Sequence, residues 1–276
     1  MRKVILGITG IILVFITWNI IAGVKDTPAL PRAWDVIVCT IGLLGNAEYW
    51  THIFASLKIV LWGIGIATAL GIVLGITLSR FAIVNDVLMP FLDGIRGVSG
   101  LSLLPLLIIL VGIDSPSRII VIIWTAWPAV MFSTIHALSI DQSVVEAGQI
   151  DGANKSKIMF SMQIPIGLPG IMNGIRIGSS GGWISLIAAE MLGATRGLGY
   201  FLLYSSQSFH FAEVYATIVV IALLGGTMNR FLYIAQTIIE RRLEGNVEKN
   251  EVGIRNGLDS AVGNGIVYGV QTTITR

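Results

Sequence analysis

The chain has 276 residues, of which 54% are hydrophobic and 12% are charged, and its formal net charge is +2. A soluble domain carries roughly 25% charged residues, so this composition excludes an ordinary soluble domain and favours an all-α, polytopic membrane protein. The small net charge gives no indication of a nucleic-acid partner.

Apolar stretches long enough to cross the ~30 Å bilayer core recur along the chain. The first follows a basic start and is followed by no A-x-A cleavage site, which predicts a retained first transmembrane helix in residues 1–24. Further spans are predicted at residues 59–79, 97–113, 119–140, 166–189 and 214–239. We therefore expect about six transmembrane helices in contact with the lipid bilayer.

Residues 25–55 separate the first two spans. Trp34, Tyr49 and Trp50 are suited to the membrane interface. This composition predicts an external segment with a short interfacial helix.

Basic residues favour one side of the predicted topology. The larger group, on the side of the N-terminus, contains Arg2, Lys3, Arg80, Arg96, Lys155, Lys157, Arg241 and Arg242. The smaller group contains Lys25, Arg32, Arg118 and Arg196. Because cytoplasmic loops carry the excess of lysine and arginine, we expect a multi-pass protein with both termini in the cytoplasm.

The fifth span carries glycines at Gly170, Gly174, Gly178 and Gly182. At this spacing they form one smooth helix face, which lets helix backbones approach closely in lipid. Such a face either packs within the chain or slides against, or meets, a second copy.

The predicted cytoplasmic loop, residues 141–169, is polar and locally well specified. A capping box ends at Glu146, and Gly152 is a weak point where we expect a bend or break. Pro165 and Pro169 are expected to end the helical piece before the fifth span. A mere connector needs about five residues, so the loop is either a docking element or simply long.

The motif in this loop resembles the EAA loop of ABC-importer permeases, whose pattern is E-A-A-x3-G-x9-I-x-L-P. Here it reads Glu146-Ala147-Gly148, three residues, Gly152, nine residues, then Met162-Gln163-Ile164-Pro165. The spacing agrees throughout, and the departures are Gly148, Met162 and Ile164.

The resemblance extends over residues 50–242. Stretches such as Ser56-Leu57, Leu104-Pro105-Leu106 and Ala188-Ala189-Glu190-Met191-Leu192-Gly193 are similar to the branch that imports nitrate, sulfonates, taurine, bicarbonate and some vitamin precursors. Members of that branch usually have prolines after the arginine that matches Arg96, whereas this chain has Gly97-Val98-Ser99-Gly100. This difference predicts a more flexible entry to the third span.

The resemblance implies a type I importer permease bundle with a core domain at residues 56–242 and cytoplasmic coupling helices. It implies a homodimer with two ATPase subunits and an external solute-binding protein, in a bacterial or archaeal cytoplasmic (inner) membrane. Glu146, Ala147, Gly148 and Gly152 would contact a groove of the ATPase, and Pro165 would fix the elbow.

The sequence contains no ATP-binding loop of its own. Gly152-Ala153-Asn154-Lys155-Ser156 lacks the second glycine of G-x4-G-K-[ST] and follows no predicted strand. We therefore expect no enzyme activity and no cofactor or metal bound by this chain, with ATP and Mg on the partner ATPase. The scattered histidines and the single cysteine agree with this expectation.

Two charged residues lie within the fifth predicted span. Because charges are costly at membrane depth, Arg176 and Glu190 are candidates for the pathway or its gate. They share a helix face but are ~21 Å apart, too far to pair. Arg176 either faces a pathway and attracts an anion or snorkels or pairs with Asp93, whereas Glu190 is expected to order the loop at residues 197–199.

The remaining segment, residues 243–276, is polar, rich in glycine and without a clear helical period, which predicts a mobile cytoplasmic tail. The expected function is a permease subunit coupled through residues 146–169, with a small anion or a vitamin precursor as substrate. An ion-coupled secondary transporter would need mid-membrane carboxylates, and only Glu190 comes close. A membrane scaffold or sensor subunit stays open, while no motif of a membrane-embedded enzyme occurs in the spans.

Overall fold

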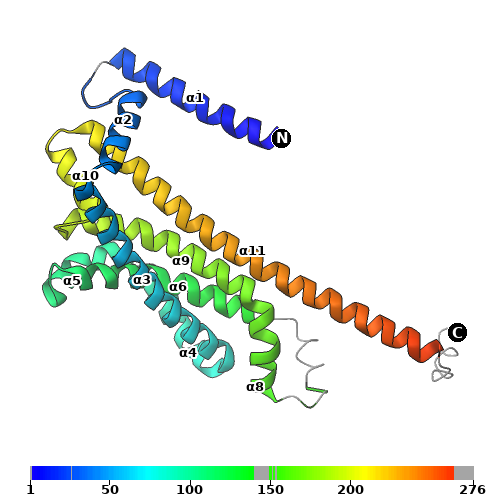
Figure 1. Cartoon of the computed structure of the whole chain (residues 1–276). Helices are drawn as coiled ribbons and strands as arrows, with labels where there is room; N and C mark the ends of the chain where they lie inside the picture. The colour runs from blue at the N-terminus through cyan, green and yellow to red at the C-terminus, as the bar shows by residue number, and fades with distance from the viewer. Residues whose placement is uncertain (1, 26, 140–148, 151, 153, 264–276) are drawn as a thin grey trace.

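The computed structural model describes all residues except 1, 26, 140–148, 151, 153 and 264–276. The described residues form helices and no strand, which confirms the predicted all-α fold (Figure 1). In chain order the helices are α1 (Arg2–Lys25), α2 (Ala33–Leu44), α3 (Ala47–Arg80), α4 (Ala82–Arg96), the 3-10 helix η1 (Gly100–Leu103), α5 (Leu104–Val111), α6 (Ser115–Leu138), α8 (Lys155–Ile158), the π-helix η2 (Met159–Gln163), α9 (Ile164–Gly193), α10 (Leu198–Gln207) and α11 (Phe211–Gly263).

In the described part of the chain, 4 helical segments are long and apolar enough to cross a membrane, or up to 5 if a bent pair counts as one span. The four are Ala47–Arg80, Ser115–Leu138, Ser156–Gly193 and Phe211–Leu243. The first predicted span coincides with α1, whose part Ile12–Lys25 counts as a shorter apolar helix. Helix α2 lies within the predicted external segment, residues 25–55.

The third predicted span is not one straight helix. Its place is taken by the bent pair, Ile83–Arg96 followed by Gly100–Val111, with an angle of 80° between the two parts. The bend falls at residues 97–99, where the sequence has glycine and serine in place of the expected prolines. The sequence predicted a departure from the family pattern at this entry to the third span, and the structure shows that the chain changes direction there.

Helix α6 lies at the centre of the bundle, between α3 and α9. Glycines on α3 allow this close approach, because a Cβ atom built on Gly63 would lie 2.6 Å from Ile122 Cγ2 and one built on Gly71 would lie 2.6 Å from Val130 Cβ. Gly75 is equally close to Thr134. The α3 backbone therefore packs directly on α6.

The glycines of α9 also pack against α6. A Cβ atom built on Gly170 would lie 2.7 Å from Ala137 Cβ, and one built on Gly178 would lie 2.8 Å from the Ala126 carbonyl oxygen. Gly174 and Gly182 approach Ser133 and Ile122 in the same way. In this structure the glycine face thus packs within the chain.

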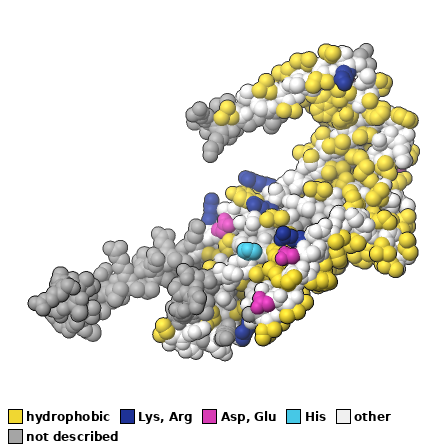
Figure 2. All heavy atoms as spheres, turned by 180° about the vertical axis from the view of Figure 1, so that it is seen from behind, with side chains coloured by type: hydrophobic (Ala, Val, Ile, Leu, Met, Phe, Trp, Pro, Cys, Tyr) yellow, Lys and Arg dark blue, Asp and Glu magenta, His cyan; other side chains and the backbone are white. Residues whose placement is uncertain are grey.

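The surface of the bundle is strongly apolar. Large side chains such as Ile83 and Ile109 are each 81% exposed, which a water-soluble protein of this size would rarely tolerate over so much of its surface. In Figure 2, hydrophobic side chains cover most of the upper part of the visible face, while most charged side chains gather lower down. This distribution suits a bundle that contacts lipid along its sides.

The prediction that Pro165 and Pro169 end a helix is wrong. Residues Ser156–Gly193 form one helical run, with η2 immediately before Pro165 and with Pro169 inside α9. Proline interrupts an α-helix because it lacks the N–H that would bond four residues back. In η2 the bonding pattern is already wider, since Ile164 N–H donates to the Met159 carbonyl, and the run continues around a bend that is visible between α8 and α9 in Figure 1.

The C-terminal segment also differs from its prediction. Helix α11 continues past residue 243 to Gly263, although the sequence there shows no clear helical period. A helix that is already formed adds further residues at low cost, because nucleation is the unfavourable step. The polar segment is therefore helical as far as Gly263.

Candidate functional site

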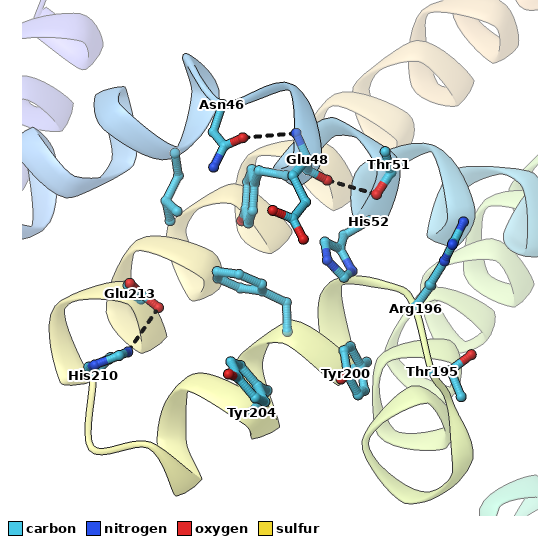
Figure 3. Close-up of a pocket in the computed structure, with 13 residues that line it drawn as sticks. Asn46, Glu48, Thr51, His52, Thr195, Arg196, Tyr200, Tyr204, His210 and Glu213 are labelled. Carbon is cyan, nitrogen blue, oxygen red and sulfur yellow. Dashed lines mark hydrogen bonds and ion pairs between the residues drawn. The ribbon is translucent and has the colours of Figure 1, made fainter.

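A pocket of about 720 Å³ lies where α2, α3, α10 and the start of α11 meet. We call it the α10 pocket, and the predicted topology places it on the outer side of the membrane. Figure 3 shows Glu48 and His52 extending from α3 toward Tyr200 and Tyr204 of α10. The His52 and Tyr200 rings stack with centroids 5.9 Å apart, and Tyr200 and Tyr204 stack at 6.2 Å. Arg196 also lines the pocket.

Local interactions shape the walls of the α10 pocket. Asn46 caps α3, because its Oδ1 accepts a hydrogen bond of 2.9 Å from the Glu48 N–H. At the other wall, Glu213 Oε2 lies 3.6 Å from His210 Nδ1 and accepts a hydrogen bond of 2.9 Å from Ser205 Oγ. The pocket therefore carries charges of both signs together with a row of aromatic rings.

Beside the pocket, Glu190 is fully buried (0% exposed). Its carboxylate accepts a hydrogen bond from Ser56 Oγ, 2.7 Å from Oε1, and one of 2.8 Å from the Gly199 N–H. Ser56 Oγ in turn accepts a hydrogen bond of 2.9 Å from the Leu198 N–H. Glu190 and Ser56 thus hold the loop that enters α10.

Gly197 completes this arrangement, which we call the Glu190 site. Its backbone has a φ of 129°, and its N–H donates a hydrogen bond of 3.2 Å to His52 Nδ1. A Cβ atom on Gly197 would run into the Glu190 carboxyl group, so a side chain is excluded there on two grounds. Arg118, buried at the start of α6, supplies a positive charge that acts on Glu190.

The expectation that Glu190 orders the loop at residues 197–199 agrees with these contacts. Sequence reasoning missed its partners, because Ser56 is 134 positions away from Glu190 and lies on another helix. The only available signal was that Ser56 begins one of the short stretches shared with the permease branch. His52 and Arg118 carried no such signal.

Arg176 faces a different neighbour. Its Nη2 donates a hydrogen bond of 3.0 Å to Asn173 Oδ1, and its guanidinium carbon lies 5.5 Å from the centroid of the Tyr233 ring on α11. Asp93 is not among its partners in the described residues. Arg176 does not pair with Glu190, in agreement with the predicted separation of the two residues along the helix. It does not line the α10 pocket either.

The structure describes part of the predicted cytoplasmic loop, residues 141–169. Gly152 has a φ of 76°, and its N–H donates a hydrogen bond of 3.0 Å to the Gln149 carbonyl, which confirms a turn at this glycine. Asn154 then caps α8, because its Oδ1 accepts a hydrogen bond of 2.8 Å from the Lys157 N–H. Pro165 is the second residue of α9. Glu146, Ala147 and Gly148 lie outside the described residues.

Among the described residues, no group of three or more His, Cys, Asp or Glu side chains is arranged to hold a metal ion. Polar side chains instead gather at the α10 end of the bundle and along the helical run that leads from the loop. The fold and these features are those of an apolar helical bundle suited to a membrane.

Comparison with known proteins identifies the family. Residues 67–245 match the model of the binding-protein-dependent transport system inner membrane component. The chain therefore belongs to this family of ABC-importer permeases, in the branch whose members are named as permeases for taurine, nitrate, aliphatic sulfonates and bicarbonate. It is a multi-pass protein of the inner membrane.

Individual relatives match over most of their length. The taurine transport system permease protein of Escherichia coli is 31% identical over 81% of this chain and 84% of its own length. The nitrate import permease protein of Synechocystis is 28% identical over 86% of this chain and 90% of its own. The fold is similar to a chain of the MetNI methionine ABC transporter in an inward-facing conformation, with a TM-score of 0.59, 18% identity, and coverage of 70% of this chain and 94% of that one.

Proposed function

We propose that this chain forms the transmembrane pathway of an ATP-driven importer and couples to a separate ATPase through residues 146–169. The observation that carries the proposal is the unbroken helical run Ser156–Gly193, which connects the loop to the centre of the bundle. Because α9 packs on α6 through its glycine face, a force on α8 reaches the central helix without passing through a flexible joint. Such a connection suits a two-state element that ATP biases.

Within this proposal, Glu146, Ala147, Gly148 and Gly152 contact a groove of the ATPase. Gly152 is exposed and in the left-handed region, which directs the chain sharply before Asn154 caps α8. Pro165 lies at the bend that transmits the motion. Closure of the ATPase subunits then moves α8 and rocks α9 against α6 between inward-open and outward-open states.

The assembly consists of two copies of this chain, two ATPase subunits and an external solute-binding protein. ATP and Mg belong to the ATPase, and this chain binds no cofactor and is not an enzyme. Both termini lie in the cytoplasm, which places the α10 pocket on the outer face, where the binding protein delivers its solute. Glu190 holds the gate loop at this end, and Arg176 belongs to the pathway wall shared with α11.

The substrate is a small anion or a vitamin precursor. The relatives with the same architecture are named for taurine, nitrate, aliphatic sulfonates and bicarbonate, all of which carry an acidic oxygen group. Their common chemistry supports an oxyanion rather than a metal ion or a sugar.

Co-purification with candidate ATPase subunits tests the coupling proposal. The wild-type chain is expected to retain an ATPase through detergent extraction and size-exclusion chromatography. The double variant Glu146→Arg with Gly152→Pro should lose it, because proline fixes φ near −65° whereas Gly152 has a φ of 76°.

Glu48→Arg provides the matched control, since it makes the same charge reversal at the α10 pocket and should leave capture unchanged. Each variant must elute as a single species and melt within a few degrees of wild type. If the double variant still captures the ATPase, or if the wild type captures none, the coupling role is refuted. An ion-coupled transporter or a scaffold subunit would then explain the chain better.

A further inference from the structure

The break between α4 and η1 is a fixed structure with a hollow beside it. A Cβ atom on Gly100 would lie 2.5 Å from Thr125 Oγ1 and 2.9 Å from the Val121 carbonyl oxygen, so the break is packed tightly on α6. Trp124 Nε1 donates a hydrogen bond of 3.0 Å to the Val98 carbonyl. These contacts hold the 80° bend in place.

The hollow has a volume of about 400 Å³, within the range of roughly 300–1,000 Å³ that is typical of small-molecule sites. We call it the Arg96 hollow. It is lined by Arg96 and Ser99 from the break and by Thr125, Phe132 and Ser133 from α6. These α6 residues belong to the middle and second half of Ser115–Leu138, so Arg96 lies alongside this apolar helix and not in a cytoplasmic loop, where the sequence had placed it.

Among the residues that the structure describes, Arg96 is the only charged one that lines the hollow, and no carboxylate of that part of the chain lines it. Its guanidinium carbon lies 4.9 Å from the centroid of the Phe132 ring, and no ion pair or hydrogen bond to Arg96 occurs among the described residues. The Arg96 side chain is exposed beside an apolar helix, and a cation without an acidic partner in such a place is a candidate for a functional site. Arg176 differs, since Asn173 and Tyr233 already engage its side chain.

Hydroxyl groups add to the donors of the hollow. Ser99 and Ser133 have no side-chain hydrogen bond in the described part of the chain. Thr125 Oγ1 donates to the Val121 carbonyl at 2.9 Å and accepts from Ser185 Oγ at 3.1 Å, so its hydroxyl is occupied. The free groups are therefore one guanidinium and two hydroxyls.

This set of groups matches one ligand chemistry. A guanidinium presents a planar fork of donors that fits two oxygens of one acidic group, and hydroxyls can donate to a third. The aromatic rings of Trp124 and Phe132 replace water around the ligand, which strengthens each of these interactions. A metal ion or an organic cation would instead meet the positive charge of Arg96.

We propose that the Arg96 hollow binds a single small oxyanion in the membrane, with Arg96 as its anchor and Ser99 and Ser133 as additional donors. The inference rests on the proposed transport function and specifies where the pathway recognises its substrate. The α10 pocket, by contrast, carries the carboxylates of Glu48 and Glu213, which disfavour the binding of a simple anion there. The solute therefore passes the α10 end and is held at the break.

The test measures ligand-dependent melting of the purified full-length permease in lipid nanodiscs. A ligand that binds only the folded state raises the melting temperature in a saturable way that yields an apparent Kd. Nitrate and methanesulfonate are the oxyanion probes and choline is the cation probe, all titrated at constant ionic strength. At least one oxyanion is expected to give a saturable shift in the wild type, whereas choline gives none.

Substitutions at Arg96 decide the assignment. Arg96→Gln should weaken oxyanion binding at least tenfold, and Ser133→Ala about threefold, because each removes a donor to the ligand. Arg96→Lys keeps the positive charge but loses the planar fork of donors, so its affinity for the oxyanion should lie between those of the wild type and Arg96→Gln. This variant remains informative if Arg96→Gln yields little folded protein. Arg80→Gln is the matched control, since Arg80 also lies over a ring, Phe81 at 5.8 Å, but does not line the hollow.

The proposal is overturned if no oxyanion probe gives a saturable shift, if choline binds as well as the oxyanions, or if Arg96→Gln binds like the Arg80 control. Because the melting experiment uses the permease alone, its result does not depend on the ATPase. Failure to capture an ATPase would refute the coupling role, whereas oxyanion binding that does not depend on Arg96 would refute only this inference.

Discussion

The Glu190 site and the Arg96 hollow both bring charge into an apolar bundle, but they do so in opposite ways. At the Glu190 site, each carboxylate oxygen lies within hydrogen-bonding distance of a donor from Ser56 or Gly199, and Arg118 contributes an opposite charge. In the hollow, the Phe132 ring is the one partner of the Arg96 guanidinium within the described part of the chain. The protein itself supplies the hydrogen-bond partners of Glu190, whereas the donors of the Arg96 guanidinium remain available to a ligand.

This contrast separates a structural role from a binding role. A buried charge whose partners all come from the chain stabilises one arrangement of the backbone, here the loop into α10. A charge that lacks partners inside the protein keeps its interactions available for something that arrives from outside. Substitutions should therefore lower stability at the Glu190 site and ligand binding at the Arg96 hollow.

The largest loss of stability is expected for Gly199→Ala. The new methyl group would overlap the Ile187 carbonyl oxygen and would lie 2.7 Å from Glu190 Cβ, so the loop or α9 must shift. Such overpacking costs about 1–3 kcal/mol, and the backbone contact here places the effect at the upper end. Thermal melting of the purified protein measures it. Gly226→Ala on α11 is the control, because nothing lies within 4 Å of its added Cβ atom.

Glu190→Ala is expected to come next. Removing the carboxylate leaves the Gly199 N–H without its acceptor, at a cost of about 1–3 kcal/mol, whereas the Ser56 hydroxyl keeps the hydrogen bond that it accepts from the Leu198 N–H. Glu190→Gln keeps one acceptor oxygen and should cost less. Equal melting temperatures for the Ala and Gln variants would show that hydrogen bonding to the loop does not explain the burial of Glu190.

Arg96→Gln should give the reverse pattern. Its melting temperature without ligand should stay close to that of the wild type, with a change below ~0.5 kcal/mol, since no partner in the described residues is lost apart from the Phe132 ring. Uptake of the substrate by proteoliposomes that contain the full transporter should fall at least tenfold. A large loss of stability with normal uptake would remove the contrast between the two sites.

The smallest effect is expected for His210→Ala in the α10 pocket. His210 and Glu213 form an i,i+3 pair at 3.6 Å, with side chains 60% and 33% exposed. Exposed pairs of this kind contribute below ~0.5 kcal/mol and are screened by salt. Melting curves of the wild type and the variant should therefore superimpose. A shift of several degrees would indicate that this wall of the pocket carries more of the fold than its exposure suggests.

Much of the architecture follows from the sequence alone. Long apolar stretches predicted most spans, because the bilayer sets the length of a helix that crosses it. The spacing of Gly170, Gly174, Gly178 and Gly182 predicted a close-packed face, because the period of the helix aligns them. The motif around Gly152 and Pro165 indicated the permease family, which the comparisons established.

Other features depended on contacts between distant parts of the chain. Arg96 and Arg176 both interrupt apolar surroundings, and only the fold shows that Tyr233 of α11 covers Arg176 while Arg96 faces a hollow. Pro165 lies within a helical run because a π-helical segment precedes it. Composition and periodicity determine whether a segment prefers lipid and which residues share a helix face. Which charge is satisfied and which is left open is decided by the neighbours that tertiary packing brings to it.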